Sequence, residues 1–423
     1  MRFVEMSRGQ FNKFRSTFPN PNVYQMAEYG ELMSGQGYNY FFVGIIDDMK
    51  EIIAAALVLY KILPTNNKYA YIPGGMLIDY DDHEVLKFFT KSMKVYFKKR
   101  NVAYFKIDPM VPINIKDIYG NNTSTPNKGL TEYLKSLGYQ HFGYNKYFEN
   151  LKPRFNAILE TTATSEDIYN RFSDELKHKL VRAKEQNVAV YKGAPEHVKG
   201  FYNLIKHKIP NRDLKHFENC FDIYNKKESL MEIYFAKIDT EGALTLAKYN
   251  YEKESAYNAK LADNLQQPNL TNRDEILSAK MKSDNKVTEY HKDVVTATAL
   301  LQNYPTGLIT STAAIIKNGK EIFFLIDGSL NDFRDYYGKE LIYWTIIKEY
   351  ADLNYDKFNL NAVSGNLHPT DKYARLLNFK GGFGTSIYEY PGEFDLVVNM
   401  GQYNFLNKLP GFNLFGKTDD RNK

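Results

Sequence analysis

The feature that most constrains the fold is a change of pattern between residues 241 and 304. Strand-like alternation stops there, and two long stretches, Leu246–Leu265 and Asp274–Asn303, have the character of helices. The polar residues 266–272 separate them, and Pro268 and Asn269 interrupt any continuous helix. Two long helices joined by a short loop form an antiparallel hairpin. Basic and acidic residues are equal in number from Thr245 to Asn303, which argues against a role in gripping nucleic acid by charge alone.

Strand and helix patterns alternate before this helical arm. Runs of β-branched and aromatic residues predict strands, and apolar residues three and four apart predict helices. A Thr-x-x-Asp cap opens one of the helices. The predicted strands are Tyr40–Ile46, Ile52–Tyr60, Tyr69–Ile72, Val102–Ile107, Phe155–Leu159, Val188–Tyr191 and Met231–Ile238. The predicted helices are Asp82–Lys99, Leu130–Leu137, Thr164–Arg171, Glu175–Gln186, Pro195–Lys208 and Asp213–Asn225.

The same alternation returns after the arm. Strands are predicted at Leu308–Ile316 and Glu321–Ile326, and Asn318-Gly319 between them is a strong signal for a type I′ hairpin turn. A helix at Lys339–Asp352 and a short strand at Phe358–Leu360 follow. The chain therefore holds two similar α/β units, and the helical hairpin is inserted into the second.

Length supports this division, because 423 residues are too many for one compact core. We expect a first domain at 1–150 and a second domain formed by 151–240 and 305–395. The arm occupies 241–304. The tail, residues 396–423, is expected to pack back on the first domain.

Composition excludes several classes of protein. A hydrophobic content of 43% and a charged content of 25% are ordinary for a soluble globular chain. The single cysteine, Cys220, rules out an internal disulfide and any cysteine-based zinc site. The N-terminus lacks the apolar core of a secretory signal, and no apolar run approaches the length of a membrane span. We therefore expect a cytoplasmic protein whose membrane contact is at most peripheral.

Positive charge is concentrated in one segment. Between Arg171 and His216 the excess of basic over acidic residues is larger than the net charge of the whole chain, which is +5. Half of the eight histidines also lie in this segment. Such a concentration predicts a phosphate-bearing partner. A pair of solvated amphipathic helices is the alternative.

A second candidate site is the stretch Asn378–Asp395. Phe379 and Lys380 precede Gly381-Gly382, which predict a turn, and a strand is predicted at Thr385–Tyr390. Glycines let the backbone approach a ligand closely. A lysine at the lip of such a turn would place a positive charge against an anion or a polarised carbonyl. The alternative is an ordinary β-turn with a solvated lysine.

Seven short motifs, in this order and spacing, resemble those of one family. They are Tyr104–Pro109, Lys152-Pro153-Arg154, Asn211-Arg212-Asp213, Gly328–Arg334, Asn361–Gly365, Asn378–Gly382 and Gly392–Asp395. The chain resembles, over nearly its whole length, the Fem family of aminoacyl-tRNA-dependent transferases, which build peptidoglycan cross-bridges in the cell wall. The resemblance implies an α/β (α+β) fold of two GNAT-like acyltransferase domains with an inserted antiparallel two-helix coiled-coil arm.

The resemblance also implies a reaction. An amino acid is transferred from its tRNA ester to a stem-peptide amine of a lipid-linked (lipid II-type) or UDP-linked muropeptide. The ester is already activated, so neither a metal nor a cofactor is expected; aminoacyl-tRNA is a co-substrate. The implied partners are the aminoacyl-tRNA, the muropeptide, the inner face of the cell membrane, and a second copy or a related family member.

Residue roles are implied by the same motifs. Lys380 matches a lysine expected to support the ester carbonyl or the tRNA end, and Asp108 an aspartate expected to orient or deprotonate the attacking amine. For Asp108, a cap of the turn before Pro109 is the alternative. Arg212 matches an arginine for the acceptor phosphate or carboxylate, and His216 stands where some relatives have tyrosine. Further predicted substrate-binding residues are Arg154, Phe324, Arg334, Phe379 and Gly381; for Arg334, pairing with Asp332 or Asp335 is the alternative.

Two departures from the family pattern concern the acceptor. Met33 stands where relatives usually have lysine, and Gly74-Gly75-Met76 where they often have Arg-Gly-Pro. The loss of two cations predicts an altered acceptor geometry or substrate. An acetyl-CoA-dependent GNAT N-acyltransferase is one alternative function, but no convincing pyrophosphate loop opens a helix. A non-catalytic tRNA-binding or scaffold protein is another. The enzymatic interpretation predicts that Asp108 and Lys380 face one groove.

Overall fold

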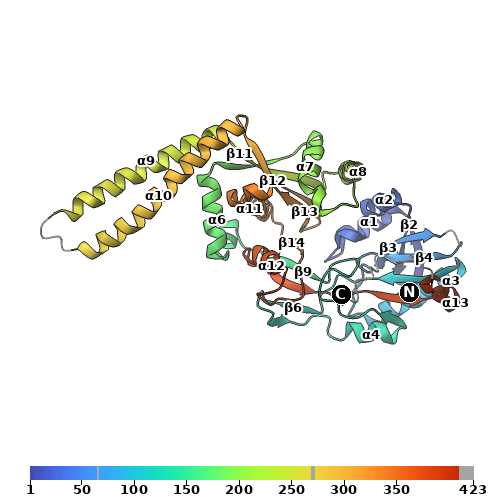
Figure 1. Ribbon diagram of the computed structural model, residues 1–423. Coiled ribbons are helices and arrows are strands. Elements are labelled where there is room, and N and C mark those ends of the chain that lie inside the picture. Colours follow the sequence, from blue (N-terminus) through green and yellow to red (C-terminus); the bar gives the residue numbers. More distant parts are fainter. Residues whose placement is uncertain (64–65, 268–271, 409–423) are drawn as a thin grey trace.

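The computed structural model describes residues 1–63, 66–267 and 272–408, and its strands form two sheets. Figure 1 shows a lobe around each sheet and a long helical arm that projects from the second lobe. The first sheet has the strand order β1-β2-β3-β4-β5-β16-β8, and the second β10-β11-β12-β13-β14-β9-β15-β6-β7. Pro268 and Asn269, which the sequence places in the turn of the arm, lie outside the described residues.

The first lobe is an almost wholly antiparallel sheet with helices on its faces. Only β4 and β5 run parallel, because α3 crosses between them. Asp82 caps α3 by accepting a hydrogen bond from the backbone of Val85, and the apolar face of α3 packs on the sheet. The elements are β1 Arg2–Met6, α1 Arg8–Thr17, α2 Ala27–Ser34, β2 Asn39–Ile46, β3 Ile52–Ile62, β4 Lys68–Ile72, α3 His83–Lys99, β5 Val102–Ile107, α4 Leu130–Ser136, β8 Tyr139–His141, β16 Phe394–Val397 and α13 Met400–Lys408.

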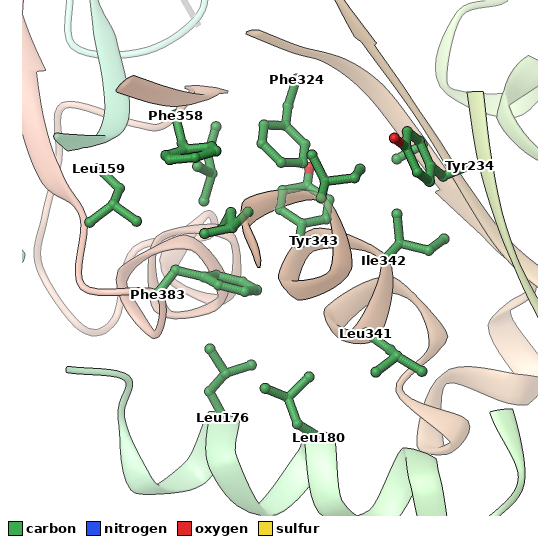
Figure 2. Close-up of a cluster of buried hydrophobic side chains, with 14 of the residues drawn as sticks. Leu159, Leu176, Leu180, Tyr234, Phe324, Leu341, Ile342, Tyr343, Phe358 and Phe383 are labelled. Carbon is green, nitrogen blue, oxygen red and sulfur yellow. The ribbon is translucent and has the colours of Figure 1, made fainter. Parts of the chain in front are cut away.

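The second lobe is built on the larger sheet, and its helices bury two main apolar clusters, one with α5, α6, α11 and α12 and the other with α7 and α8. In Figure 2, Leu176 and Leu180 of α6 point toward α11 and Phe383. The strands are β6 Asn114–Lys116, β7 Asn122–Ser124, β9 Phe155–Glu160, β10 Val188–Lys192, β11 Met231–Ile238, β12 Leu308–Asn318, β13 Glu321–Ser329, β14 Lys357–Ala362 and β15 Ser386–Glu389. The helices are α5 Ser165–Asn170, α6 Asp174–Glu185, α7 Val198–Ile205, α8 Leu214–Asn225, α11 Gly338–Asp352 and α12 Ala374–Gly381.

The chain crosses between the lobes in both directions. β6 and β7 leave the first lobe and pair at the edge of the second sheet, next to β15. In return, β16 enters the first sheet between β5 and β8, and α13 packs beside it. At the junction, Asn318 accepts a hydrogen bond from Arg15 and donates one to the Pro21 carbonyl oxygen. Strand exchange and these contacts hold the lobes together.

The predicted helical hairpin is confirmed. It consists of α9 Thr240–Leu265 and α10 Arg273–Asn303, which pack against each other along the arm. α9 begins at Thr240, earlier than the sequence pattern suggested, directly after β11. At the base, Arg182 of α6 forms an ion pair with Asp293 of α10 at 2.9 Å. This bridge ties the arm to the second lobe.

Two turn predictions are wrong in detail. Asn318 pairs with Glu321 across the β12–β13 hairpin, so the loop residues are Gly319 and Lys320, and of these only Gly319 has positive φ. Asn318 stays in its strand because its amide serves the lobe junction. The predicted Gly381-Gly382 turn is present but follows a helix: Gly381 ends α12, and the Gly384 amide donates to the Gly381 carbonyl oxygen at 2.9 Å. A helix C-terminus also favours glycine, so the sequence signal was ambiguous.

Candidate functional site

A large pocket with many basic side chains lies in the second lobe, and we call it the basic pocket. It has a volume of ≈ 660 Å³ and lies where the end of β13 meets the start of α11, with α6, α12 and the segment after α7 as its other walls. Acidic side chains also line it, namely Glu175, Asp327, Asp335 and Glu340. The basic side chains are Lys179, His207, Lys208, Arg334, Lys339 and Arg375. Such a surface suits a polyanion.

Two of these acidic groups, Glu175 and Asp327, form a described ion pair, and Asp327 is the less exposed of the two. Its side chain, on β13, is only 14% exposed and accepts from Lys208 Nζ at 2.7 Å. The Tyr343 hydroxyl donates to its other oxygen at 2.9 Å. Burial alone would raise the pKa of Asp327, but Lys339, Lys208 and the two hydrogen bonds outweigh burial and leave this pKa below its ordinary value. Asp327 is therefore a carboxylate at neutral pH.

Lys380 lies in the last turn of α12. It is buried, whereas the sequence suggested a lysine exposed at a turn. The residue is 5% exposed, and its ammonium donates to the Ala362 carbonyl oxygen at 2.7 Å. Burial lowers the pKa of Lys380 to about 7, although Asp327 opposes the shift. Lys380 therefore carries a partial, weakly compensated charge just behind the basic pocket, whose lining includes its neighbour Phe379.

Strand geometry explains how Lys380 reaches β14. The parallel strands β13 and β14 pair only from Glu321–Phe323 to Lys357–Asn359. Beyond this pairing Asn361 adopts a left-handed conformation with φ +65°, held by hydrogen bonds between its side chain and the backbone. The Ala362 carbonyl is thus available to Lys380 rather than to β13.

A second pocket lies between the lobes, and we call it the interlobe pocket. Its volume is ≈ 650 Å³; Leu32, Gly35 and Gln36 line it from the end of α2, and Arg212 and His216 line it from the start of α8. Asp213 caps α8 by accepting from the His216 backbone, which presents both predicted residues at one helix end. Burial and the Arg212 charge lower the pKa of His216. The structure thus brings together two residues predicted to bind the acceptor.

The two pockets share one wall. His207 and Lys208 line the basic pocket, and residues 210–213 of the same segment line the interlobe pocket. α7, which leads into this segment, packs on β12 and β13. The short segment 207–213 therefore separates a basic site from an interlobe site.

Asp108 lies directly after β5 in the first lobe. It is buried and accepts from the Tyr71 hydroxyl at 2.5 Å and from the Gly74 amide at 2.6 Å. Burial raises the pKa of Asp108 to about 7, while the Lys152 charge opposes this rise. Lys152 is held over the Tyr24 ring at 3.7 Å. By accepting from the Gly74 amide, Asp108 caps a turn, but it is the turn at Gly74 and not the one before Pro109.

Neither Asp108 nor Lys380 is among the residues that line the two pockets. Lys380 adjoins the basic pocket, whereas Asp108 is near Lys152, which donates to Tyr29 of α2 at 3.0 Å. Neither Lys152 nor Tyr29 lines the interlobe pocket. The two pockets therefore do not supply the single groove that the sequence predicted between Asp108 and Lys380.

The other predicted residues fall into two groups. Phe379 and Arg334 line the basic pocket; Lys339 lies 3.8 Å above the Phe379 ring, and Arg334 donates to Asn331 at 2.6 Å rather than pairing with Asp332 or Asp335. The remaining three are in packed surroundings. Arg154 pairs with Glu389 at 2.6 Å and bonds two backbone carbonyls, Phe324 stacks on Tyr343 at 4.3 Å in the core, and Gly381 packs against Ile118.

The two departures from the family pattern have local explanations. Met33 packs against the apolar cluster of the first lobe. Gly74 has φ +72°, and a Cβ atom there would lie 2.4 Å from Asn22 Oδ1. An arginine does not fit at Gly74 while Asn22 holds this position.

Sequence reasoning missed Asp327, Lys208 and Lys339. One signal was available, since Asp327 ends the apolar run Ile322–Ile326 just as Asp108 ends an apolar strand. The two lysines gave no such signal, because only the fold brings them to this carboxylate. Among the described residues, no cluster of His, Cys, Asp or Glu is arranged to hold a metal ion, and none of the described helices is long and apolar enough to cross a membrane.

Known proteins resemble the chain over nearly its full length. Aminoacyltransferase FemA of Staphylococcus aureus is 25% identical over 414 residues, which are 95% of this chain and 97% of that protein. Aminoacyltransferase FemA of Staphylococcus epidermidis is 25% identical over 423 residues, 97% and 99% of the two chains. A crystal structure of FemX superposes with a TM-score of 0.75 at 21% identity, covering 96% of this chain and 99% of that one, which confirms the predicted α/β fold. The model of the FemAB family matches residues 6–410, and the chain therefore belongs to the FemAB family, as its motifs predicted.

Proposed function

We propose that this chain is an aminoacyltransferase that moves an amino acid from aminoacyl-tRNA to a stem-peptide amine of a peptidoglycan precursor, toward the interpeptide bridge. The observation that carries the proposal is the pair of pockets on either side of residues 207–213, in a chain whose relatives are named aminoacyltransferases. A transfer reaction needs two substrates to meet, and a shared wall places two binding sites next to each other.

The basic pocket is the proposed donor site. Its lysine and arginine side chains suit the phosphates at the 3′ end of a tRNA, and Phe379 offers an aromatic face to a base. Lys380 lies behind Phe379, where its positive charge acts on the ester carbonyl in the low-dielectric interior.

The interlobe pocket is the proposed acceptor site. Arg212 and His216 face it, and the guanidinium of Arg212 suits the diphosphate or a carboxylate of a muropeptide. Met33 and Gly74, which replace two cations of the family pattern, do not line this pocket. We infer that the diphosphate is held mainly from the α8 side.

The proposed chemistry is aminolysis of an ester. The acceptor nitrogen attacks the ester carbonyl carbon, a C–N bond forms, the C–O bond breaks, and the ribose hydroxyl leaves with the proton that the amine loses. Lys380 supports the negative charge that develops on the carbonyl oxygen. Asp108, whose pKa is about 7, stays our proposal for the proton acceptor or orienting group on the first-lobe side. Because Asp108 lines neither pocket, this role requires the acceptor amine to extend beyond the interlobe pocket toward Asp108.

Cellular place and assembly follow from the substrates. A lipid-linked acceptor would bring the enzyme to the inner face of the cell membrane, and a tRNA donor would keep it in the cytoplasm. Pairing with a second copy or a related family member stays a prediction.

The test is a transfer assay in which tRNAs charged with one amino acid at a time are combined with a lipid-linked or a UDP-linked acceptor. We expect one combination to increase the acceptor mass by one amino-acid residue. Deacylated tRNA is the control, and acetyl-CoA tests the alternative donor. Acetyl transfer without any aminoacyl transfer would contradict the proposal.

A further inference from the structure

The basic pocket contains one buried carboxylate that the proposed reaction does not use. Asp327 stands among Lys208, Lys339 and Lys380, and its side chain is only 14% exposed. Of the other acidic lining residues, Glu175 is 76% exposed in its side chain and Asp335 is exposed, whereas Glu340, in the first turn of α11, is half-buried. Asp327 differs from Glu340 in that Lys208 and Tyr343 hold its carboxylate inside the pocket, and a negative charge held this way among cations requires a specific explanation.

The surroundings of Asp327 fix one of its oxygens and leave the other adjustable. Tyr343, which holds Oδ2, is itself fixed by stacking on Phe324 and by edge contact with Phe379. Lys208, which bonds Oδ1, is 43% exposed and lies in the segment between the two pockets. A ligand ammonium can therefore join or replace Lys208 without disturbing the position of the carboxylate.

An aminoacylated tRNA end carries two opposite charges within a short distance. Its phosphates are negative, whereas the α-amino group beside the ester is a positive ammonium at neutral pH. Basic side chains attract the phosphates but repel the ammonium. A carboxylate at the inner end of the pocket would compensate this ammonium, and it has no such role for a donor whose α-amine is blocked.

Building on the proposed function, we propose that Asp327 binds the α-ammonium of the aminoacyl group. The basic pocket then recognises the aminoacylated 3′ end of the tRNA by two charges: the basic side chains bind its phosphates, and Asp327 binds its ammonium. It follows that the pocket discriminates against donors whose α-amine is blocked. The alternative, that Asp327 only anchors Lys208, predicts no such discrimination.

The experiment compares kcat/KM for one aminoacyl-tRNA with kcat/KM for its N-acetyl derivative. The donor is the aminoacyl-tRNA that the wild-type enzyme uses in the transfer assay. We expect wild type to prefer the free amine by about tenfold or more, because the N-acetyl donor has no ammonium for Asp327 to bind. Asp327→Asn is expected to bring this ratio close to one, mainly by raising KM for the free-amine donor.

Two matched variants separate the proposal from its alternative. Asp335→Asn removes an exposed carboxylate from the same pocket and is expected to keep the wild-type ratio. Lys208→Met removes the ion-pair partner but keeps Asp327, so it too should preserve the ratio. A ratio that is lost in Lys208→Met but retained in Asp327→Asn would overturn the proposal.

The wild-type measurement guards against a variant that fails to fold. Equal use of the two donors by wild type would overturn the Asp327 proposal while leaving aminoacyl transfer established. Absence of transfer from every aminoacyl-tRNA would instead contradict the proposed function. The two failures are therefore distinguishable.

Discussion

Each lobe contains a buried lysine, Lys106 in β5 and Lys380 in α12, and the two differ in how their positive charge is compensated. In the first lobe, Lys106 is 1% exposed and forms ion pairs with Glu393 and Asp395, both at 2.9 Å. Burial lowers its pKa, but the two carboxylates outweigh burial and raise it overall. In the second lobe, Lys380 has one backbone carbonyl as its described hydrogen-bond partner, and its pKa falls to about 7.

The difference separates a structural charge from a functional one. Lys106 joins β5 to β16, so its ion pairs connect the first and the last third of the chain. Two carboxylates satisfy its charge, and nothing is left to offer a ligand. Lys380 lies behind a pocket with its charge only partly compensated, which costs stability but leaves an electric field available to a substrate.

The largest expected effect is on stability, in Lys106→Met. This change leaves the buried carboxylates of Glu393 and Asp395 without their cation, which should lower the free energy of unfolding by about 3–5 kcal/mol. Urea unfolding measures it. Lys135→Met is the control, because the Lys135–Glu132 pair is exposed and its removal should hardly change the free energy of unfolding. If the free energy of unfolding fell by a similarly small amount in both variants, the ion pairs of Lys106 would not stabilise the fold as inferred.

Lys380→Met should reduce activity strongly and stability little, the opposite of Lys106→Met. Removal of the charge behind the basic pocket is expected to lower kcat by roughly 100-fold, equivalent to about 2.7 kcal/mol. Stability should hardly fall, because methionine keeps most of the buried volume and removes a desolvated ammonium. Lys380→Ala would be a poor test, since it leaves a cavity that itself costs about 2–3 kcal/mol. Normal turnover in a folded Lys380→Met protein would remove Lys380 from the site.

The pH dependence of stability gives an independent check on Lys380. Its folded pKa of about 7 is below the ordinary lysine value, so the unfolded chain binds more protons between these two values. Wild-type stability should therefore gain from this group as pH rises from about 7 toward 10. Lys380→Met should lack that gain.

The contrast between the lysines also shows how far sequence reasoning reaches. Local patterns found most of the strands, the helical arm and the carboxylate at the end of β5, because periodicity and apolar runs are local properties. They missed the short strands β1, β6, β7, β8 and β16. Lys106 lies in a recognised motif, but its partners are almost 300 positions away, and no local pattern pairs them. The burial of Lys380 was missed because two glycines suggested a turn where α12 actually ends.

The last expected effect concerns Asp108, the other predicted catalytic group. Its folded pKa of about 7 is above the ordinary aspartate value, so the folded chain binds more protons between pH 4 and pH 7. Asp108 therefore contributes stability that is fully present at low pH and is lost as pH rises through about 7. Asparagine cannot titrate, so the stability of Asp108→Asn relative to wild type should increase with pH by at most about 1.4 kcal/mol per unit.

Urea unfolding of both proteins at several pH values between 4 and 8 measures this difference. A constant offset would reflect only the altered hydrogen bonds to Tyr71 and Gly74, whereas a slope reports the titration of a buried carboxyl group. A difference that does not change with pH would mean that Asp108 is ionised throughout, like Asp327. Asp108 would then belong with the compensated charges of the first lobe, and its proposed role as proton acceptor near neutral pH would lose its physical basis.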